Sequence, residues 1–521
     1  MHPSSRVHLV IVLAVCLAMA VPAVATVSLP SMFSDHMVVQ RDRDLPVWGW
    51  AKPGETVEVT IDGAQRSTQA DDAGAWRVTV PPLQAEDNPF TLTVRGENTL
   101  EIEDVLAGEV WICSGQSNMF FNVARIMRRM DDPPDAAQPA ADDQLRLFKV
   151  ERETADTPQQ DVSGQWAVAD EEAIRGFSAV GYYFGRDLRS ALDVPVGLIQ
   201  SAWGGTPADA WTSWERLAAH PELKPIVERY HSEKLQRETI QSEYNDKVQA
   251  WKKKAREAKE KGDKRPRRPR KPRQLRPSHY PAHLYNAMIA PLVPFAIRGA
   301  VWYQGESNAG RAYQYRTLLP AMIRTWRESW GYDFPFGIVQ LTNFRKPQSQ
   351  PDEKSAWAEL REAQLMTAQQ VPHTGLAVII DIGEADDIHP KNKWDVGKRL
   401  ALWARDEVYN QDVVSSGPIY NHFTKEGDRI RLHFDHVDGG LAARGDSLEG
   451  FVIAGPDKKF HWADAEIDGD TVVVESEKVD NPVSVRYGWA NNPPANLYNE
   501  AGLPATPFRT DNWPGVTRER R

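Results

Sequence analysis

The sequence predicts an α/β fold: a doubly wound parallel sheet with helices on both faces, preceded by a β-sandwich and followed by a β-rich unit. Between about residues 105 and 410, short apolar runs alternate with stretches of helical periodicity, which is typical of buried parallel strands joined by helices. On either side of this region, short runs of alternating apolar and polar residues are separated by turn residues, which indicates antiparallel sheets.

Residues 1–25 have the composition of an export signal. Arg6 precedes an apolar run over 7–19, and alanines occupy the small-residue positions before a cleavage site after Ala25. The apolar run is too short for a stable membrane span, and no later segment approaches ~20 apolar residues. We therefore expect a protein exported to the periplasm or the medium, without a stable membrane span after cleavage.

The charge of the chain is negative overall and locally positive in one segment. The 521 residues carry a net charge of −10, which gives no indication of a nucleic-acid partner. Residues 252–276, however, carry a net charge of +11, so the rest of the chain carries −21. Once residues 1–25 are removed, Cys113 is the one remaining cysteine, which excludes an internal disulfide and is expected to be a small buried residue.

The N-terminal β-sandwich is expected over residues 26–104. Four alternating runs lie within it, and turn residues such as Asp62-Gly63 separate them. No residue pattern there indicates chemistry, so the unit either braces the next domain or binds sugar, and we favour bracing. The four runs are 47–50, 56–61, 76–80 and 90–94.

The central α/β domain is expected over residues 105–410, with its chemistry at the carboxyl ends of its strands. Helices are expected at 179–191, 312–330 and 357–370. The expected parallel strands are 110–113, 196–200, 299–303, 336–341 and 376–381.

An insert at residues 230–278 interrupts this domain. Apolar residues at helical spacing predict a helix, and they are Leu235, Ile240, Tyr244, Val248 and Trp251. Prolines at every third position from 266 to 272 then favour an extended, solvated chain. This basic segment is either a charged surface loop or an arm that attracts an anionic glycan or an acidic membrane face.

The C-terminal unit, residues 411–521, is expected to be rich in strands. Its expected strands are 429–434, 450–454, 471–475 and 483–486. The tail over 490–513 carries Tyr498, Phe508 and Trp513, so we expect it to wrap over a neighbouring domain.

Ser117 lies where a parallel sheet keeps its active site, because it follows the strand 110–113 and a tight turn, Ser114-Gly115-Gln116. A serine in this position acts as a nucleophile when a helix begins behind it and a histidine arrives from another part of the fold. Taken alone, these residues fit equally well a strand-to-helix turn in which Ser117 only caps the helix.

Three later strand ends supply the partners that acyl transfer by a serine requires. His389 has Asp387 and Asp386 two and three positions before it, so one loop can present a general base and the carboxylate that orients it. Donors for a tetrahedral oxyanion come from the glycines at 204 and 205 and from the amide of Gln304. No spacing indicates a metal site or a phosphate-binding loop, so we expect neither a metal nor a cofactor.

The motifs differ from the nucleophile elbow of α/β-hydrolases, which requires glycine at position 119, where this chain has Met119. The order of Ser before Asp-x-x-His is similar to that of the SGNH hydrolases, and most of the mature chain closely resembles the sialate O-acetylesterase family of carbohydrate esterases. The resemblance is carried by SGQSNM at 114–119, WGGTP at 203–207, LYNAMIAPL at 284–292, WYQGESN at 302–308, DIHPKNK at 387–393 and PFRTD at 507–511.

The resemblance implies an SGNH-type sheet, with Ser117 as nucleophile and His389 as base. It implies an oxyanion hole formed by the N–H of Ser117, the N–H of Gly204 or Gly205, and the amide of Gln304. For the orienting carboxylate, the SGNH spacing selects Asp386, whereas the Asp-Ile-His-Pro run of the family favours Asp387. Further side chains expected to contact substrate are Gln116, Asn118, Trp203, Glu306 and Asn308.

The function we expect is that of an exported serine esterase, which removes O-acetyl groups from a sugar or glycan by a Ser-His-Asp mechanism through an acetyl-enzyme. An alternative substrate is a plant or algal polysaccharide such as xylan or pectin. A second alternative is a carbohydrate-binding protein on an inactive hydrolase scaffold, against which the intact Ser117, Gln304 and His389 argue.

Overall fold

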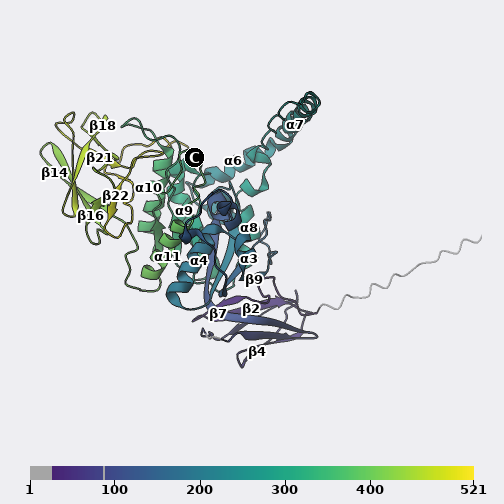
Figure 1. The fold of residues 1–521 in the computed structure, drawn as a ribbon. Coiled ribbons are helices and arrows are strands. Elements are labelled where there is room, and N and C mark those ends of the chain that lie inside the picture. Colours follow the sequence, from purple (N-terminus) through teal and green to yellow (C-terminus); the bar gives the residue numbers. More distant parts are fainter. Residues whose placement is uncertain (1–25, 86–87, 521) are drawn as a thin grey trace, which may run out of the picture.

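The computed structural model describes residues 26–85 and 88–520, so the expected export signal lies outside the described residues. The N-terminal strands form one end of the molecule, the C-terminal strands form a separate lobe, and the α/β domain lies between them (Figure 1). The long helix α7 (Arg237–Lys261) projects from this body. None of the described helices is long and apolar enough to cross a membrane.

The α/β domain is built on a sheet with the strand order β13-β12-β11-β7-β10-β8-β9, in which every neighbouring pair is parallel except β8 with β9. The five predicted strands are therefore present, while β8 and β9 were not expected. The strands are β7 (Thr99–Gly115), β8 (Asp142–Lys149), β9 (Trp166–Ala169), β10 (Val196–Ala202), β11 (Gly299–Tyr303), β12 (Phe336–Val339) and β13 (Thr374–Ala377).

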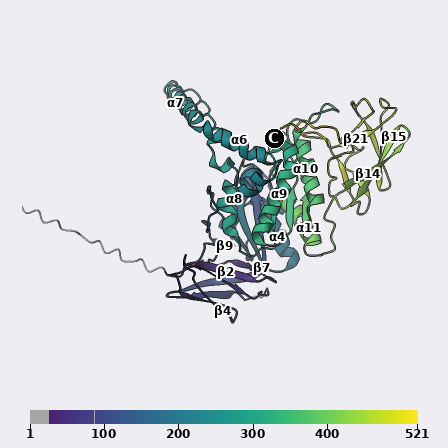
Figure 2. The same cartoon turned by 180° about the vertical axis from the view of Figure 1, so that it is seen from behind.

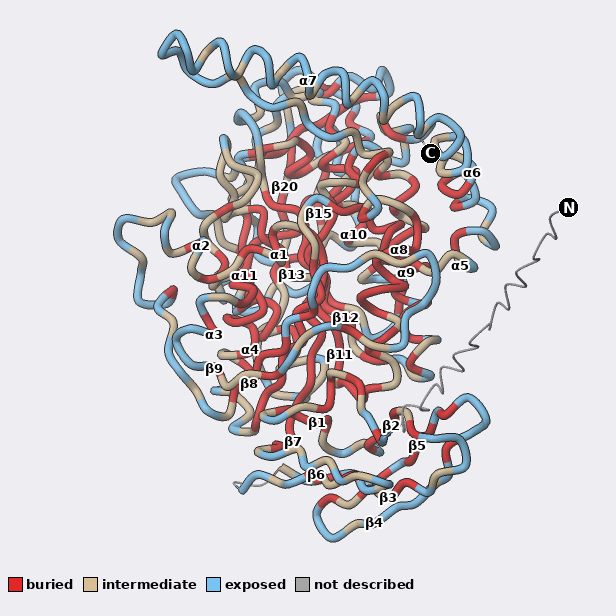
Figure 3. Tube along the Cα trace, turned by 90° about the vertical axis from the view of Figure 1, so that its right-hand side faces the viewer, coloured by how far each residue is buried: buried red, intermediate tan, exposed pale blue. Residues whose placement is uncertain are grey.

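Helices cover both faces of this sheet. In β11, Ala300 and Trp302 belong to the core that contains α9 (Ala312–Trp330) and α10 (Ala356–Gln370). Val301 and Tyr303 point to the opposite core, which contains α4 (Ala179–Leu192) and α11 (Trp394–Glu407). Strands β10, β11 and β12 and the second half of β7 are thus buried on both faces, which explains their largely apolar sequences (Figure 3). The remaining short helices are α1 (Ser117–Phe120), α2 (Val123–Met127), α3 (Glu171–Gly176), α5 (Trp214–Ala219) and α8 (His283–Met288).

The N-terminal unit and the α/β domain share β7. Its first half pairs with β6, and its second half lies at the centre of the large sheet between β10 and β11. The boundary expected after residue 104 falls inside β7, where Asp104 has a φ of 54°. This continuous strand fixes the unit to the base of the sheet. The other strands of the unit are β1 (Val38–Gln40), β2 (Leu45–Trp50), β3 (Thr56–Ile61), β4 (Ala64–Gln69), β5 (Ala75–Val80) and β6 (Phe90–Arg95).

The C-terminal lobe is β-rich, as predicted, and its tail returns to the α/β domain. On α10, the buried guanidinium of Arg361 donates to the carbonyls of Ala490 and Asn491 at 2.8 and 3.0 Å. The tail therefore contacts the helix layer. The strands are β14 (Ile419–Glu426), β15 (Arg429–Asp435), β16 (Leu441–Ala443), β17 (Phe451–Ala454), β18 (Phe460–Trp462), β19 (Asp464–Asp468), β20 (Thr471–Glu475), β21 (Ser484–Tyr487), β22 (Leu497–Asn499) and β23 (Phe508–Arg509).

The insert consists of α6 (Lys224–Leu235), α7 and a non-helical return segment (Figure 2). The expected apolar stripe is correct from Ile240 to Trp251, whose residues are half-buried. The expectation is wrong for Leu235, the first residue of the stripe. Leu235 ends α6 and is 88% exposed, because α6 and α7 are separate helices that meet at Gln236.

Candidate active site

Ser117 is the first residue of α1, directly after the turn that ends β7. The turn needs a glycine at position 115, where φ is 138° and a Cβ would lie 2.2 Å from the carbonyl oxygen of Tyr303. The chain leaves β7 towards β8, whereas it leaves the neighbouring β11 towards β12. Ser117 thus lies at the carboxyl edge of the sheet, where the strand order reverses and α/β proteins bind ligands.

His389 reaches Ser117 from the loop between β13 and α11. Its Nε2 lies 3.0 Å from the Ser117 Oγ, which is within hydrogen-bond distance. The ring of Phe121 lies beside the imidazole, with 4.5 Å between the centroids. Burial lowers the pKa of His389, and the cations of Lys393, Arg125 and Arg129 lower it further, while Asp387 opposes them. The imidazole is therefore mainly neutral at pH 7, which is the state that accepts a proton.

Asp387, and not Asp386, contacts His389. The Asp387 Oδ1 accepts the backbone N–H of His389 at 2.9 Å and lies 3.4 Å from its Nδ1. Asp386 is exposed, and no contact with His389 is recorded for it within the described residues. Arg129 holds this arrangement, because it donates to the Asp387 Oδ2 at 2.5 Å and to the carbonyl of His389 at 2.8 Å. The geometry favours Asp387 as the orienting carboxylate.

Gly204 lies against Ser117 in the loop after β10. A Cβ at this position would lie 3.5 Å from the Ser117 Cβ, so a larger side chain would fill the space beside the hydroxyl. Gly205 has a φ of 79°, which allows the loop to turn there. The N–H of Trp203 donates to the carbonyl of Gly115 at 3.1 Å and so ties this loop to the Ser117 turn.

Gln304 does not point its amide towards an oxyanion, which corrects the expectation from the sequence. The residue is fully buried, and its Nε2 donates to the Thr206 carbonyl at 3.2 Å and to the Asn308 Oδ1 at 2.7 Å. Both amide hydrogens therefore have protein acceptors. The Asn308 Oδ1 also accepts the N–H of Ala208 at 2.9 Å, whereas no acceptor is recorded for the Asn308 Nδ2 in the part of the chain described.

Behind Ser117, Asn118 connects a carboxylate, a backbone carbonyl and a buried lysine. Its Nδ2 donates to the Glu306 Oε1 at 2.6 Å and to the carbonyl of Ile388 at 3.1 Å, and its Oδ1 accepts from the Lys393 Nζ at 2.6 Å. Burial lowers the pKa of Lys393 to about 7 and raises that of Glu306. Asn118 and Glu306 were expected to contact substrate; instead they form a buried network that ties the Ser117 turn to the residue before His389.

The other two predicted contact residues lie close to Ser117. Gln116 is buried, and its Oε1 accepts the N–H of Ser307 at 3.2 Å, which joins the turn to the loop after β11. Trp203 is half-buried, and the guanidinium of Arg152 lies 5.4 Å from the centroid of its ring. Trp203 therefore remains available at the surface beside Gly204.

The sequence did not single out Arg129 or Lys393 as functional residues. Arg129 lies in an unremarkable basic pair, so no local pattern could identify its contact with Asp387. Lys393 ends the Asp-Ile-His-Pro-Lys-Asn-Lys run, so its motif was a signal, but its burial beside Asn118 depends on residues 275 positions apart.

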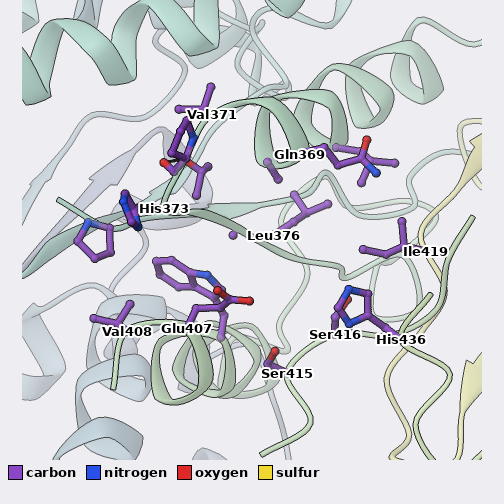
Figure 4. Close-up of a pocket in the computed structure, with 17 residues that line it drawn as sticks. Gln369, Val371, His373, Leu376, Glu407, Val408, Ser415, Ser416, Ile419 and His436 are labelled. Carbon is purple, nitrogen blue, oxygen red and sulfur yellow. Dashed lines mark hydrogen bonds between the residues drawn. The ribbon is translucent and has the colours of Figure 1, made fainter. Parts of the chain in front are cut away.

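A separate pocket of about 390 Å³ lies at the amino ends of β12 and β13 (Figure 4). Its lining includes His373, Glu407, Ser415 and His436, which come from the α/β domain and from the start of the C-terminal lobe. This is the edge of the sheet opposite to Ser117. The pocket is therefore separate from the site formed by Ser117 and His389.

Comparisons with known proteins agree on one kind of enzyme. The family model described as "Carbohydrate esterase, sialic acid-specific acetylesterase" matches residues 273–404. A crystal structure of a carbohydrate acetylesterase from Xanthomonas citri is 38% identical, covers 94% of this chain and 100% of its own, and has a TM-score of 0.79. The sialate O-acetylesterases of Mus musculus and Homo sapiens are each 28% identical; they match 92% and 93% of this chain and 93% of their own lengths.

The fold, the site and these likenesses together define a carboxylic ester hydrolase that acts on acetylated carbohydrate. The chain belongs to the sialate O-acetylesterase family of carbohydrate acetylesterases.

Proposed function

We propose that this protein is an exported, SGNH-type serine esterase, which removes O-acetyl groups from carbohydrates through an acetyl-enzyme. The observation that carries the proposal is the 3.0 Å contact between the Ser117 Oγ and the His389 Nε2 at the carboxyl edge of the sheet. A neutral imidazole in that position can accept the hydroxyl proton as the oxygen attacks the acetyl carbon.

In the first half of the reaction, the Ser117 Oγ forms a bond to the acetyl carbon, and the proton passes to the His389 Nε2. Collapse of the tetrahedral intermediate breaks the bond to the sugar oxygen, which takes that proton and leaves as an alcohol. In the second half, a water gives a proton to the His389 Nε2 and its oxygen forms a bond to the acetyl carbon. The bond from that carbon to the Ser117 Oγ then breaks, His389 returns the proton to the Oγ, and acetate leaves. Asp387, held by Arg129, keeps the imidazole oriented and stabilises its positive charge.

The oxyanion of the intermediate needs donors that already point at it. We assign this role to the N–H groups of Ser117 and of Gly204 or Gly205, which lie on two loops in contact. The third donor is the Nδ2 of Asn308, since the Asn308 Oδ1 is held by Gln304 and Ala208. Gln304 then acts indirectly, as a positioning residue for Asn308. Trp203, half-buried beside Gly204, provides a ring against which the sugar can pack.

The curated relatives are named sialate O-acetylesterases, and an O-acetylated sialic acid is accordingly the first substrate we propose. An acetylated plant or algal polysaccharide is the second candidate, which the strongly basic segment 252–276 favours, since pectin is both acetylated and anionic.

Acetate release from O-acetyl sialic acid, acetylated xylan and acetylated pectin, measured side by side with the mature protein, tests the proposal. The matched control is Ser117→Ala, which removes one oxygen at the surface of a turn. We expect acetate release by the wild-type protein on at least one of these substrates and none above background by the variant. Equal release by both proteins, or binding without release by both, would overturn the proposed function.

A further inference from the structure

The segment 252–276, here called the basic arm, is strongly charged, with a net charge of +11. It has 14 Lys or Arg residues against three acidic residues, Glu257, Glu260 and Asp263. The arm comprises the outer half of α7 and the return segment that follows it. The catalytic constellation uses none of these residues.

The arm stands away from the catalytic body. Helix α7 has 25 residues, none of them buried, and spans roughly 37 Å at 1.5 Å per residue. It projects from the α/β domain in both opposite views, with an exposed surface along its length (Figures 1, 2 and 3). Such a rod adds little to the core of the domain. Its cations in the arm are exposed and so can contact a large charged partner such as a polymer.

The return segment packs against α7 with its prolines and leaves its cations outside. Pro266, Pro269 and Pro272 are half-buried, while the basic residues between them are exposed. A repeat of three matches an extended polyproline-type chain, which places every third side chain on one side. The carbonyl of Pro266 accepts the indole N–H of Trp251 at 2.8 Å, which fastens the segment to the helix. The expectation of an extended, solvated chain thus holds for the cations between the prolines, while the prolines themselves are half-buried.

Protein carboxylates neutralise little of this charge. Among the described residues, the one ion pair recorded for the arm joins Arg273 to Glu233 at 2.7 Å. Arg265 and Arg268 lie over the ring of Trp251 instead, 4.8 and 5.7 Å from its centroid. Because the rest of the chain carries −21, the arm is the part of the molecule to which a polyanion is attracted.

A hollow of about 490 Å³ lies on this rod beside Trp251. It is lined by that ring, by Ala255 and by the side chains of Lys252, Arg256, Lys259, Asp263 and Arg265. An aromatic ring surrounded by cations suits a sugar that carries a carboxylate, since the ring packs against the apolar face of the sugar and the cations pair with the anion. A membrane-binding helix would instead need an exposed apolar face. On α7 the apolar stripe from Ile240 to Trp251 is only half-exposed.

We propose that the basic arm binds a polysaccharide whose residues carry carboxylates, and so holds the enzyme on a polymeric substrate. The choice of a polysaccharide rests on the proposed function, because that function makes carbohydrate the molecule the enzyme meets. Binding through the arm does not require turnover. The two proposals can therefore fail separately.

The experiment measures binding of polygalacturonate by the mature chain carrying Ser117→Ala, at about 50 mM and 200 mM salt. The arm variant adds glutamine at six exposed cations of the arm. The matched control adds glutamine at six exposed cations of the two β units. The arm positions are Lys259, Lys261, Lys264, Arg267, Arg270 and Lys271; the control positions are Lys52, Arg66, Arg95, Lys425, Lys459 and Lys478.

We expect the arm variant to bind polygalacturonate about tenfold or more weakly than its parent at the lower salt concentration, with a smaller salt dependence. The control variant should bind within about twofold of the parent, and thermal unfolding midpoints of all three proteins should agree, since every changed side chain is exposed. Neutral xylan should bind all three proteins equally.

An equal loss in the arm and control variants would overturn the proposal, because net charge alone would then explain the binding. So would an unchanged affinity of the arm variant, or arm-dependent binding to vesicles of phosphatidylglycerol with none to polygalacturonate, which would assign the arm to membranes. If polygalacturonate binds through the arm while the wild-type enzyme releases no acetate, the arm proposal stands and the proposed function fails.

Discussion

Replacing Lys393 by methionine tests the buried network behind Ser117. Methionine keeps much of the length and volume of the side chain but removes the ammonium group. The variant loses the 2.6 Å hydrogen bond from the Lys393 Nζ to the Asn118 Oδ1, and it removes the positive charge that lowers the pKa of the Glu306 carboxyl. Since the Asn118 Nδ2 also donates to the carbonyl of Ile388, the loop that carries His389 loses support.

The size of the effect follows from burial. Removing one partner of a buried charged pair costs about 3–5 kcal/mol. Burial lowers the pKa of Lys393 to about 7 and raises that of Glu306, so the pair is only partly ionised at pH 7, and we expect about 3 kcal/mol. At roughly 1 °C per kcal/mol for a chain of this length, the thermal midpoint falls by roughly 3 °C.

The assay is a double-mutant cycle in thermal unfolding at pH 7 with Glu306→Gln, whose amide oxygen still accepts from Asn118. We expect the double variant to be at least about 1 kcal/mol more stable than the sum of the two single losses predicts, which is within the usual coupling range. The reason is that the neutral amide at position 306 does not need the cation of Lys393. A Lys393→Met protein within about 0.5 kcal/mol of wild type, or additive losses in the double variant, would refute the reasoning.

Three further predictions concern the reacting groups. The pKa of His389 lies below its usual 6.5, and its neutral form is the base. In a pH profile, kcat/KM should therefore rise with pH and reach half of its plateau below pH 6.5. A midpoint above pH 6.5 would contradict the lowered pKa. Asp387→Asn should lower kcat by roughly 10²–10⁴-fold in acetate release, whereas Asp386→Asn should change it by less than about twofold, and the reverse order would assign the orienting role to Asp386. Asn308→Ala should lower kcat by roughly 10²–10³-fold with little change in KM, and an unchanged kcat would remove it from the oxyanion hole.

The sequence was sufficient for the elements whose signal is local. Four of the five predicted strands are buried on both faces, so they appear as largely apolar runs, while β13 at the edge of the sheet alternates between half-buried and buried residues. Strand β8 was missed because it is not apolar throughout: it includes Arg146, which is buried only because the distant Asp104 accepts from its guanidinium at 2.5 and 3.2 Å. An ion pair between residues that far apart leaves no pattern in the sequence.

In the site, too, the features with a local sequence signal could be predicted, and those set by distant residues could not. The strand ends that carry Ser117 and His389 could be predicted because each polar residue follows an apolar run. The direction of the Gln304 amide could not be predicted, since it is set by hydrogen bonds to the distant Thr206 carbonyl and to the side chain of Asn308. The contact of Asp387 with Arg129 likewise joins residues 258 positions apart, and the choice between the two acidic residues needed that contact.

The central claim is that Ser117 carries the acetyl group. The most direct measurement is the intact mass of the protein, followed by peptide mapping, after mixing with excess p-nitrophenyl acetate for seconds at pH 7 and then quenching in acid, which protonates His389 and stops hydrolysis of the ester. We predict one added acetyl group on the peptide that contains Ser117, lost with time in the wild type and never formed in Ser117→Ala. Rapid release of acetate with no acetyl group on that peptide, or an acetyl group formed equally in Ser117→Ala, would contradict the account.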